Sequence, residues 1–184
     1  QIGKEHQLAG VIHFAAYKAV GESTQEPLKY YQNNLGSLMV LLDFMKREGI
    51  QDLVFSSSCT VYGQPDVLPV TETTPRKDAE SPYGNTKKVC EDILVDYVKS
   101  KAGVRVISLR YFNPVGAHPS AKIGELPNGV PNNLVPFVTQ TAAGLRNKLT
   151  VFGNDYDTSD GSCVRDFIHV MDLADAHVKA LNYL

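Results

Sequence analysis

A tyrosine and a lysine stand four residues apart at two places in this sequence of 184 residues: Tyr83 with Lys87, and Tyr97 with Lys101. Residues four apart share one face of a helix, so the lysine ammonium can lie beside the tyrosine hydroxyl. A phenol has a reference pKa of about 10, and a nearby cation favours its ionised form. A phenolate that forms near neutral pH is a general base for an alcohol proton. Each pair is therefore a candidate for proton transfer.

The surroundings of the two pairs differ. Tyr83 follows a Ser-Pro dipeptide that begins a helix, and it comes after the serine run 56–58, where an apolar segment ends. Three hydroxyls leaving a buried segment either cap their own backbone or carry protons. The second pair stands at the far end of the same helix, where we expect an ordinary amphipathic helix. The sequence therefore favours Tyr83 with Lys87, and adds Ser58 as a hydroxyl between substrate and tyrosine.

Three short apolar segments, 10–16, 52–58 and 104–111, are predicted to be buried parallel strands because each ends in small or polar residues. A helix that begins at Pro27 and is stopped by Gly49 separates the first two. The helix with the Tyr-Lys pairs separates the second and third. This alternation predicts an α/β fold with right-handed crossovers, a parallel sheet and ligands at the carboxyl ends of its strands.

The second part of the chain is richer in residues typical of turns and loops. Residues 113–133 are rich in Pro, Gly and Asn and predict a long loop, which in a compact protein is functional or disordered. We expect a helix over 133–147, a strand over 149–153, and a helix over 170–184 with Asp172 in its first turn.

Composition narrows the classes of function. The net charge of -2 comes from interspersed acids and bases, which gives no basic stripe for nucleic acid and no cluster for anionic lipid. The widely spaced Cys59, Cys90 and Cys163 argue against a disulfide framework or a metal site, and for a reducing cytoplasm. No apolar run approaches the ~20 residues that span a bilayer. The chain starts without Met and close to a core segment, so we expect an excerpt from a longer polypeptide with a small-molecule or protein partner.

Several longer motifs surround the candidate residues: HFAAYKAVGEST, VFSSSCTVYG, SPYGNTK, LRYFNPVGAHPS, VPNNLVP and VFGNDYDTSDGSCVRDFIHVMDLA. Together they resemble the UDP-galactose 4-epimerases of the extended short-chain dehydrogenase/reductase family over essentially all 184 residues. The resemblance implies a Rossmann-like, doubly wound parallel sheet followed by the start of a smaller substrate-binding domain. Residues 1–113 would belong to the NAD-binding domain and residues 114–184 to the part that binds the UDP-sugar.

The resemblance also implies an activity: reversible NAD-dependent epimerisation of UDP-galactose and UDP-glucose at C4 through a 4-keto sugar. Tyr83 would take the proton of the 4-hydroxyl while hydride leaves C4. Lys87 would lower the Tyr83 pKa and hold the nicotinamide ribose, and Ser58 would bridge the sugar and Tyr83.

Further residues are assigned by the same resemblance. Those along NAD would be Phe14, Ala15, Ala16, Lys18, Asn33 and Phe112, together with the catalytic three. Those along the UDP-sugar would be Asn113, Asn133, Leu134, Phe152 and Arg165, together with Ser58 and Tyr83. A guanidinium fork such as that of Arg165 suits a diphosphate. Without the resemblance, Asn33 would be interpreted as a cap or a solvated residue, Phe112 as core, and Arg165 as an ion-pair partner of Asp166.

The sequence departs from the family pattern at a few places. Ala16-Tyr17 replaces the usual Gly-Leu, Cys59 the commoner Ala, and Phe167 the usual Tyr. Ala16 adds a methyl group and Tyr17 a large ring near the expected cofactor, and both changes affect the expected NAD affinity. No Gly-x-x-Gly-x-x-Gly turn, which would cradle the pyrophosphate, occurs in the 184 residues. We also expect the C-terminal part that closes over the sugar nucleotide to be missing, so this chain alone should be inactive.

Other functions stay open at this point. A related 4,6-dehydratase carries Asp-Glu after the strand-end hydroxyl, and a decarboxylase usually has Glu at the second place. Here Cys59 and Thr60 stand there, and a thiol of pKa about 8.5 or a hydroxyl does not replace those acids. A catalytically silent sensor or a non-functional partial product is a further alternative, against which the intact Ser58, Tyr83 and Lys87 argue.

The resemblance suggests a homodimer through the helices 27–47 and 82–101. We expect apolar side chains beyond what one sheet face buries, namely Leu35, Leu38, Leu42, Ile93, Leu94 and Val98.

Overall fold

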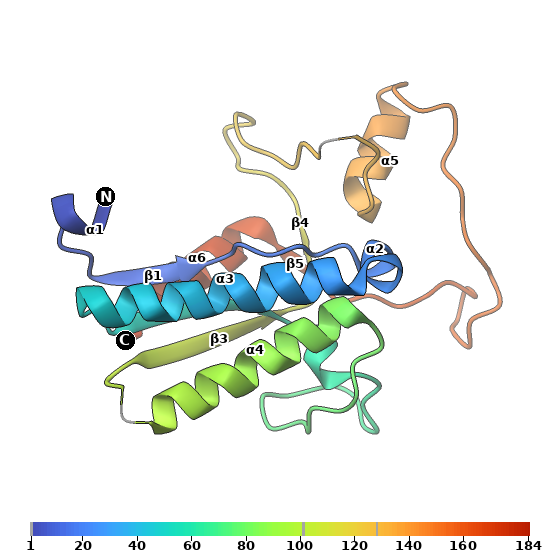
Figure 1. Ribbon diagram of the computed structural model, residues 1–184. Helices are drawn as coiled ribbons and strands as arrows, with labels where there is room; N and C mark the ends of the chain where they lie inside the picture. Colours follow the sequence, from blue (N-terminus) through green and yellow to red (C-terminus); the bar gives the residue numbers. More distant parts are fainter. Residues whose placement is uncertain (1, 101, 128) are drawn as a thin grey trace. The chain divides into compact units, whose positions relative to one another are not determined.

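The computed structural model describes residues 2–100, 102–127 and 129–184 (Figure 1). It divides into two compact units, one extending to Tyr111 and including Ala176–Leu184, the other comprising Phe112–Asp175. The predicted roles of 1–113 in NAD binding and 114–184 in substrate binding are not tested by this division and stay predictions. Among the described residues, no helix has the length and apolar character needed to cross a membrane.

A parallel sheet forms the centre of the first unit. Its strands are β1 (Gly10–His13), β2 (Asp52–Ser58) and β3 (Arg105–Tyr111), in the order β1-β2-β3. Gly10 lies opposite Asp52, which lies opposite Arg105 on its other side. The predicted α/β parallel sheet is thus confirmed. The strand predicted over 10–16 was too long, because the chain leaves the sheet after His13 while β2 continues beside β3 to Ser58.

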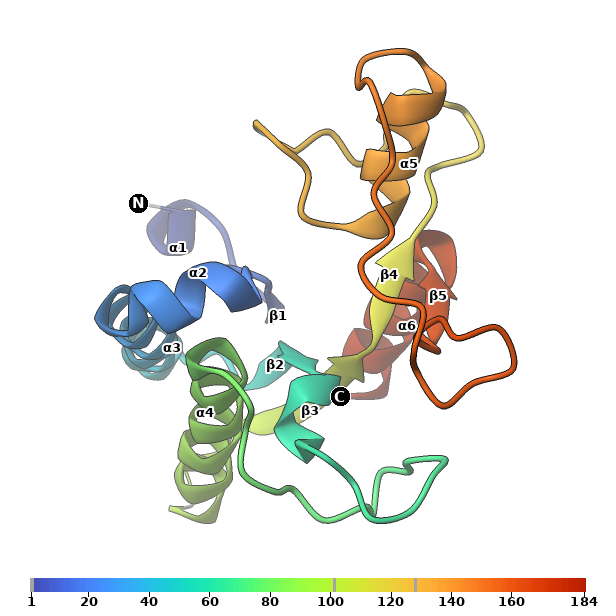
Figure 2. The same cartoon turned by 90° about the vertical axis from the view of Figure 1, so that its right-hand side faces the viewer.

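Two long helices cover one face of this sheet, and the part of α6 (Val170–Tyr183) from Ala176 onward lies on the other face (Figures 1 and 2). α3 (Pro27–Glu48) begins with Pro27 and ends at Gly49, whose φ of 69° is left-handed, as predicted. α4 (Pro82–Lys99) begins after Ser81, whose hydroxyl accepts a hydrogen bond from the Gly84 N–H. The core between helices and sheet contains Leu38, Leu42, Met45, Ile50, Leu53, Phe55, Cys90, Leu94 and Val104.

Three short helices of the first unit were not predicted: α1 (Ile2–Glu5), α2 (Val20–Gln25) and the 3-10 helix η1 (Cys59–Tyr62). η1 matters most for the site, because it follows Ser58 directly and turns the chain away from the carboxyl end of β2.

The apolar surface predicted for α3 and α4 was wrong in most of its members. Leu38, Leu42 and Leu94 are buried in the core, and Leu35 and Ile93 pack against it, because α3 and α4 pack against each other as well as against the sheet. The apolar side chains that these helices expose are Leu28, Met39, Val40, Val95 and Val98.

In the second unit, β4 (Asn113–Val115) pairs in parallel with β5 (Phe167–His169), and neither strand was predicted. α5 (Leu134–Ala142) is shorter than the helix predicted over 133–147, since Gly144 adopts a left-handed φ of 75°. The strand predicted over 149–153 is irregular, with Val151 and Phe152 exposed rather than paired. The helix predicted from residue 170, with Asp172 in its first turn, is confirmed as α6.

Candidate active site

Ser58 lies at the carboxyl end of β2, where the strand passes into η1. It is buried, and its hydroxyl oxygen accepts a hydrogen bond of 3.3 Å from the Thr60 N–H. The Ser58 hydroxyl also favours the ionised form of Tyr83 and so acts to lower the Tyr83 pKa. The capping interpretation of the serine run is thus confirmed for Ser58, and its part in proton transfer stays a prediction.

Tyr83 comes to Ser58 because α4 starts very close to η1. The contact is made at Gly84, where an added Cβ would lie 3.1 Å from the Thr60 Cβ. The glycine therefore lets the first turn of α4 approach the turn that follows Ser58. Tyr83 is half-buried there.

Lys87 lies one helical turn after Tyr83 and is almost fully buried, with 4% of its surface exposed. Its Nζ donates a hydrogen bond of 2.6 Å to the Ser56 carbonyl and lies 5.0 Å from the centroid of the Phe55 ring. The sheet thus holds the ammonium by a backbone oxygen and an aromatic face. One amine with three donors keeps hydrogen-bonding capacity for a further acceptor.

Burial works against the charged forms of both titratable groups. It raises the pKa of Tyr83, while the Ser58 hydroxyl acts to lower that pKa and Cys59 acts to raise it. Burial also lowers the pKa of Lys87 to about 8. At neutral pH Lys87 still carries a proton, and Tyr83 is a phenol. Lys87 is not among the groups that shift the Tyr83 pKa here, and a positive charge placed beside the phenol would favour proton abstraction by Tyr83.

Asn34 connects the loop after β1 to this helix start. It is buried on α3, and its side chain accepts from the Tyr17 N–H (2.9 Å) and donates to the Tyr17 carbonyl (3.1 Å). It also donates to the Thr86 hydroxyl, which donates to the Tyr83 carbonyl. The sequence did not single out Asn34. The available signal was a polar residue four positions before Leu38, on the apolar face of the helix.

The side chains predicted to contact NAD from the first unit lie on or beside this loop. Phe14, Ala15 and Lys18 are exposed, Ala16 is half-buried, and Asn33 donates to the Asn34 side-chain oxygen (3.0 Å). The Phe14 ring is 4.7 Å from that of His177. The Tyr17 ring, which departs from the family pattern, packs toward α3, 5.6 Å from the Tyr30 ring.

The residues predicted to contact UDP are spread over several segments of the second unit. Asn113 donates to the Asp166 carbonyl (2.9 Å), which fixes it beside β5. Asn133 precedes α5 and donates to Glu125 (2.6 Å). Leu134 and Phe152 are strongly exposed, and so is Phe112 to a smaller extent.

Arg165 is also exposed, and its guanidinium donates to the Val164 carbonyl (2.7 Å). Among the ion pairs of the described residues, none joins Arg165 to Asp166. Its charge is therefore available to an anion.

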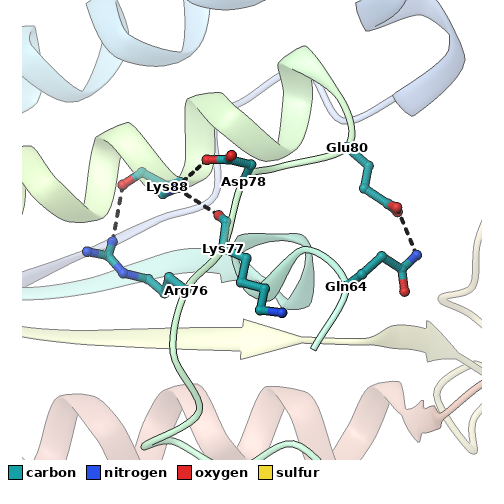
Figure 3. Close-up of a pocket in the computed structure, with 6 residues that line it drawn as sticks. All are labelled: Gln64, Arg76, Lys77, Asp78, Glu80 and Lys88. Atoms are coloured by element: carbon teal, nitrogen blue, oxygen red, sulfur yellow. Dashed lines mark hydrogen bonds and ion pairs between the residues drawn. The ribbon is translucent and has the colours of Figure 1, made fainter. Parts of the chain in front are cut away.

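A separate pocket of about 490 Å³ lies between α4 and the loop that precedes it (Figure 3). Its lining consists of Gln64, Arg76, Lys77, Asp78, Glu80 and Lys88. Lys88 lies 3.6 Å from Asp78 and donates to the Lys77 carbonyl (2.7 Å), so the charges are largely paired with one another. The pocket contains none of the three candidate catalytic residues. Across the described ranges, no group of His, Cys, Asp and Glu residues is arranged to hold a metal ion.

Comparison with known proteins gives a family match over the whole chain. The model of the NAD dependent epimerase/dehydratase family matches residues 1–184. A UDP-glucose 4-epimerase of Erwinia amylovora is 54% identical over 179 residues, which are 97% of this chain and 53% of that protein. A UDP-glucose 4-epimerase of Cyamopsis tetragonoloba is 59% identical over 174 residues, which are 95% of this chain and 49% of that protein.

Solved structures of UDP-glucose 4-epimerases are also similar to this chain. The UDP-glucose 4-epimerase of Bifidobacterium longum in complex with NAD+ and UDP has a TM-score of 0.94 at 49% identity, covering 98% of this chain and 54% of that one. The enzyme of Stenotrophomonas maltophila with bound NAD and formylated UDP-arabinopyranose has a TM-score of 0.93 at 53% identity, covering 98% and 53%. The chain thus spans about half the length of the relatives that it matches.

Proposed function

Because this chain belongs to the NAD dependent epimerase/dehydratase family, we propose that the protein containing it interconverts UDP-galactose and UDP-glucose by epimerisation at C4. The observation that carries the proposal is the gathering of Ser58, Tyr83 and Lys87 at the carboxyl end of a parallel strand. High identity to UDP-glucose 4-epimerases over nearly the whole chain supports the choice of substrate.

Tyr83 is the proton carrier in this proposal. Its oxygen takes the proton of the sugar 4-hydroxyl and later returns it to the 4-keto oxygen, so no proton is lost over the cycle. Ser58 donates to the tyrosine oxygen and lowers its pKa, and it also contacts the sugar. Lys87 stabilises the phenolate through its positive charge. NAD, when bound, accepts the hydride from C4 and gives it back to the other face of the keto sugar.

The residues of the first unit fit this cofactor. Phe14, Ala15 and Lys18 present exposed surface at the carboxyl end of β1, where parallel sheets bind nucleotides. Asn33 lies beside the same loop, and Lys87 has donors left for ribose hydroxyls. Ala16 and Phe112 complete the proposed lining. The pyrophosphate cradle would come from a part of the protein outside this chain.

The UDP-sugar would be bound by side chains of the second unit. Asn113 and Arg165 offer an amide and a guanidinium to the diphosphate, and Asn133, Leu134 and Phe152 offer polar and apolar surface to the nucleoside.

A homodimer through α3 and α4 is part of the proposal. The exposed apolar side chains of these helices support it, since water contact with them is unfavourable. Light scattering of the full-length protein after size exclusion should give twice the monomer mass, and a single monomeric species would contradict the dimer.

The function is tested by conversion of UDP-galactose to UDP-glucose by the full-length protein without added NAD. The Tyr83→Phe variant should lose activity by about 10³-fold, since general acid-base groups contribute roughly 10²–10⁴. Tyr97→Phe is the matched control, because it removes the same atom from the same helix. Full activity of Tyr83→Phe, or no conversion by the unmodified protein, would overturn the proposal.

A further inference from the structure

Glu91 is a buried carboxylate on α4, one helical turn after Lys87, with 4% of its surface exposed. Its Oε1 accepts from the Ser57 hydroxyl (2.5 Å) and from Arg110 Nε (2.9 Å). Its Oε2 accepts from Arg110 Nη2 (2.7 Å) and more weakly from Arg76 Nη1 (3.3 Å). Since an ionised carboxylate is buried only when paired, these contacts hold Glu91 in one place.

Glu91 and its partner Arg110 contact the chain both before and after Ser58. Ser57 immediately precedes Ser58 and is paired with Arg110 in the register of β2 and β3. Arg110 Nη1 also donates to the Tyr62 hydroxyl (3.0 Å), and its guanidinium carbon lies 4.9 Å from the centroid of the Tyr62 ring. Tyr62 is the last residue of η1. Glu91 and Arg110 together fix the chain just before Ser58 and four residues after it.

From this geometry we infer that Glu91 is a positioning residue, which acts through Ser57 and Arg110 to hold the Ser58 hydroxyl against Tyr83. The inference rests on the proposed function, because it assigns Glu91 a part in setting the basicity of Tyr83. The Ser58 hydroxyl acts to lower the Tyr83 pKa. If Ser58 moves away, that pKa rises, and the pH above which Tyr83 acts as a base rises with it.

The chain offers a matched control for a purely structural ion pair. Asp92 is the next residue on α4, and it binds Arg76 (2.5 Å) with 50% of its side chain exposed. Its partner lines the pocket of Figure 3, which contains no catalytic residue. Arg76 also reaches Glu91 (3.3 Å), but Asp92→Asn leaves the shorter contacts of Glu91 with Ser57 and Arg110 in place, so it should affect stability without affecting Ser58.

The experiment compares Glu91→Gln, Ser57→Ala and Asp92→Asn in the full-length protein. Bound NAD, kcat and KM for UDP-galactose, the pH profile and Tm are measured for each. Glu91→Gln should lower kcat about ten-fold and move the acidic limb of the profile up by about one pH unit, the scale of one charge-assisted hydrogen bond. KM and bound NAD should stay within about two-fold. Ser57→Ala should shift the limb in the same direction by less, and Asp92→Asn should not shift it.

A lower Tm for Glu91→Gln with an unchanged kcat and acidic limb would overturn the inference, since a structural ion pair alone would do that. If Glu91→Gln does not fold, Ser57→Ala decides, because it leaves all the ion pairs in place; an unmoved limb would then overturn the inference. Lack of conversion by the unmodified protein would instead refute the proposed function. The positioning role would then be judged from crystal structures of the protein and of Ser57→Ala, where a retained contact between Ser58 and Tyr83 would refute it.

Discussion

The side chains proposed for chemistry and those proposed for UDP binding differ in exposure. Ser58 and Lys87 are 7% and 4% exposed, while Leu134 and Phe152 are 56% and 86% exposed. The first group lies at the end of a strand and on a helix that the core holds in place, whereas the second lies on the loops and short elements of the other unit. The chemical groups are thus fixed by packing before any ligand binds. The side chains proposed for UDP binding would gain most of their contacts from the ligand, so changes there should affect KM rather than kcat.

Lys87→Met should give the largest effect and sharpen this contrast. It removes the buried cation one helical turn after Tyr83 while keeping an unbranched side chain, and kcat should fall by roughly 10²–10³-fold. KM for UDP-galactose should change little when NAD is supplied in excess. Steady-state kinetics of the full-length variant measure both.

The matched control is Lys88→Met on the same helix, whose ammonium contacts the Lys77 carbonyl and Asp78 instead. A kcat for Lys87→Met within about three-fold of that of Lys88→Met would break the contrast, because the buried cation would then contribute no more than a surface one.

Ser58→Ala should have the next largest effect, and a pH dependence. The variant removes the hydroxyl that acts to lower the Tyr83 pKa, so the tyrosine pKa should rise. A base must be deprotonated to act, so the acidic limb of kcat should move to higher pH, and kcat at neutral pH should fall about ten-fold. The pH profile of kcat measures this. An acidic limb at the unmodified position would show that Ser58 does not set the basicity of Tyr83.

Much of the fold that carries this chemistry was predictable. The three apolar runs, Pro27 at a helix start and Gly49 at its end are local signals, and each gave the element expected. The second unit gave fewer such signals. β4 and β5 have three residues each, too few for a periodic pattern, and the apolar residues of 149–153 are exposed rather than paired. Strands as short as β4 and β5 form only because they pair with each other, and the two segments are far apart in the sequence.

The site also contains residues that local sequence signals predict and residues that they do not. Tyr83 and Lys87 could be found because a helix places them four residues apart. Asn34 and Glu91 were missed because their partners come from other segments: the loop after β1 for Asn34, and β2 and β3 for Glu91. Both are polar residues on the buried face of a helix, beside Leu38 and Leu94 respectively. A polar residue on the buried face of a helix predicts a buried hydrogen bond, but the sequence does not indicate which residue is the partner.

Arg165→Met tests the exposed side of the comparison. The guanidinium is proposed to bind the diphosphate, and its loss should raise KM for UDP-galactose about ten-fold with kcat within about two-fold. Arg165→Lys should fall between, because it keeps the charge and loses the fork. Steady-state kinetics and calorimetric titration with UDP measure the two steps. A fall in kcat at unchanged KM would place Arg165 with the chemical group and break the comparison.

Tyr97→Phe should have the smallest effect. Tyr97 belongs to the second Tyr-Lys pair, whose Lys101 lies outside the described residues. The Tyr97 ring packs against the core, and its hydroxyl is buried with no hydrogen-bond partner in the part of the chain that the structure describes. Removing such a hydroxyl should leave kcat and KM within about two-fold and Tm unchanged or slightly higher, because an unpaired buried hydroxyl costs about 1–3 kcal/mol. Kinetics and thermal unfolding measure both. A large loss of kcat would mean that spacing alone, without Ser58 and the strand end, suffices for a catalytic pair.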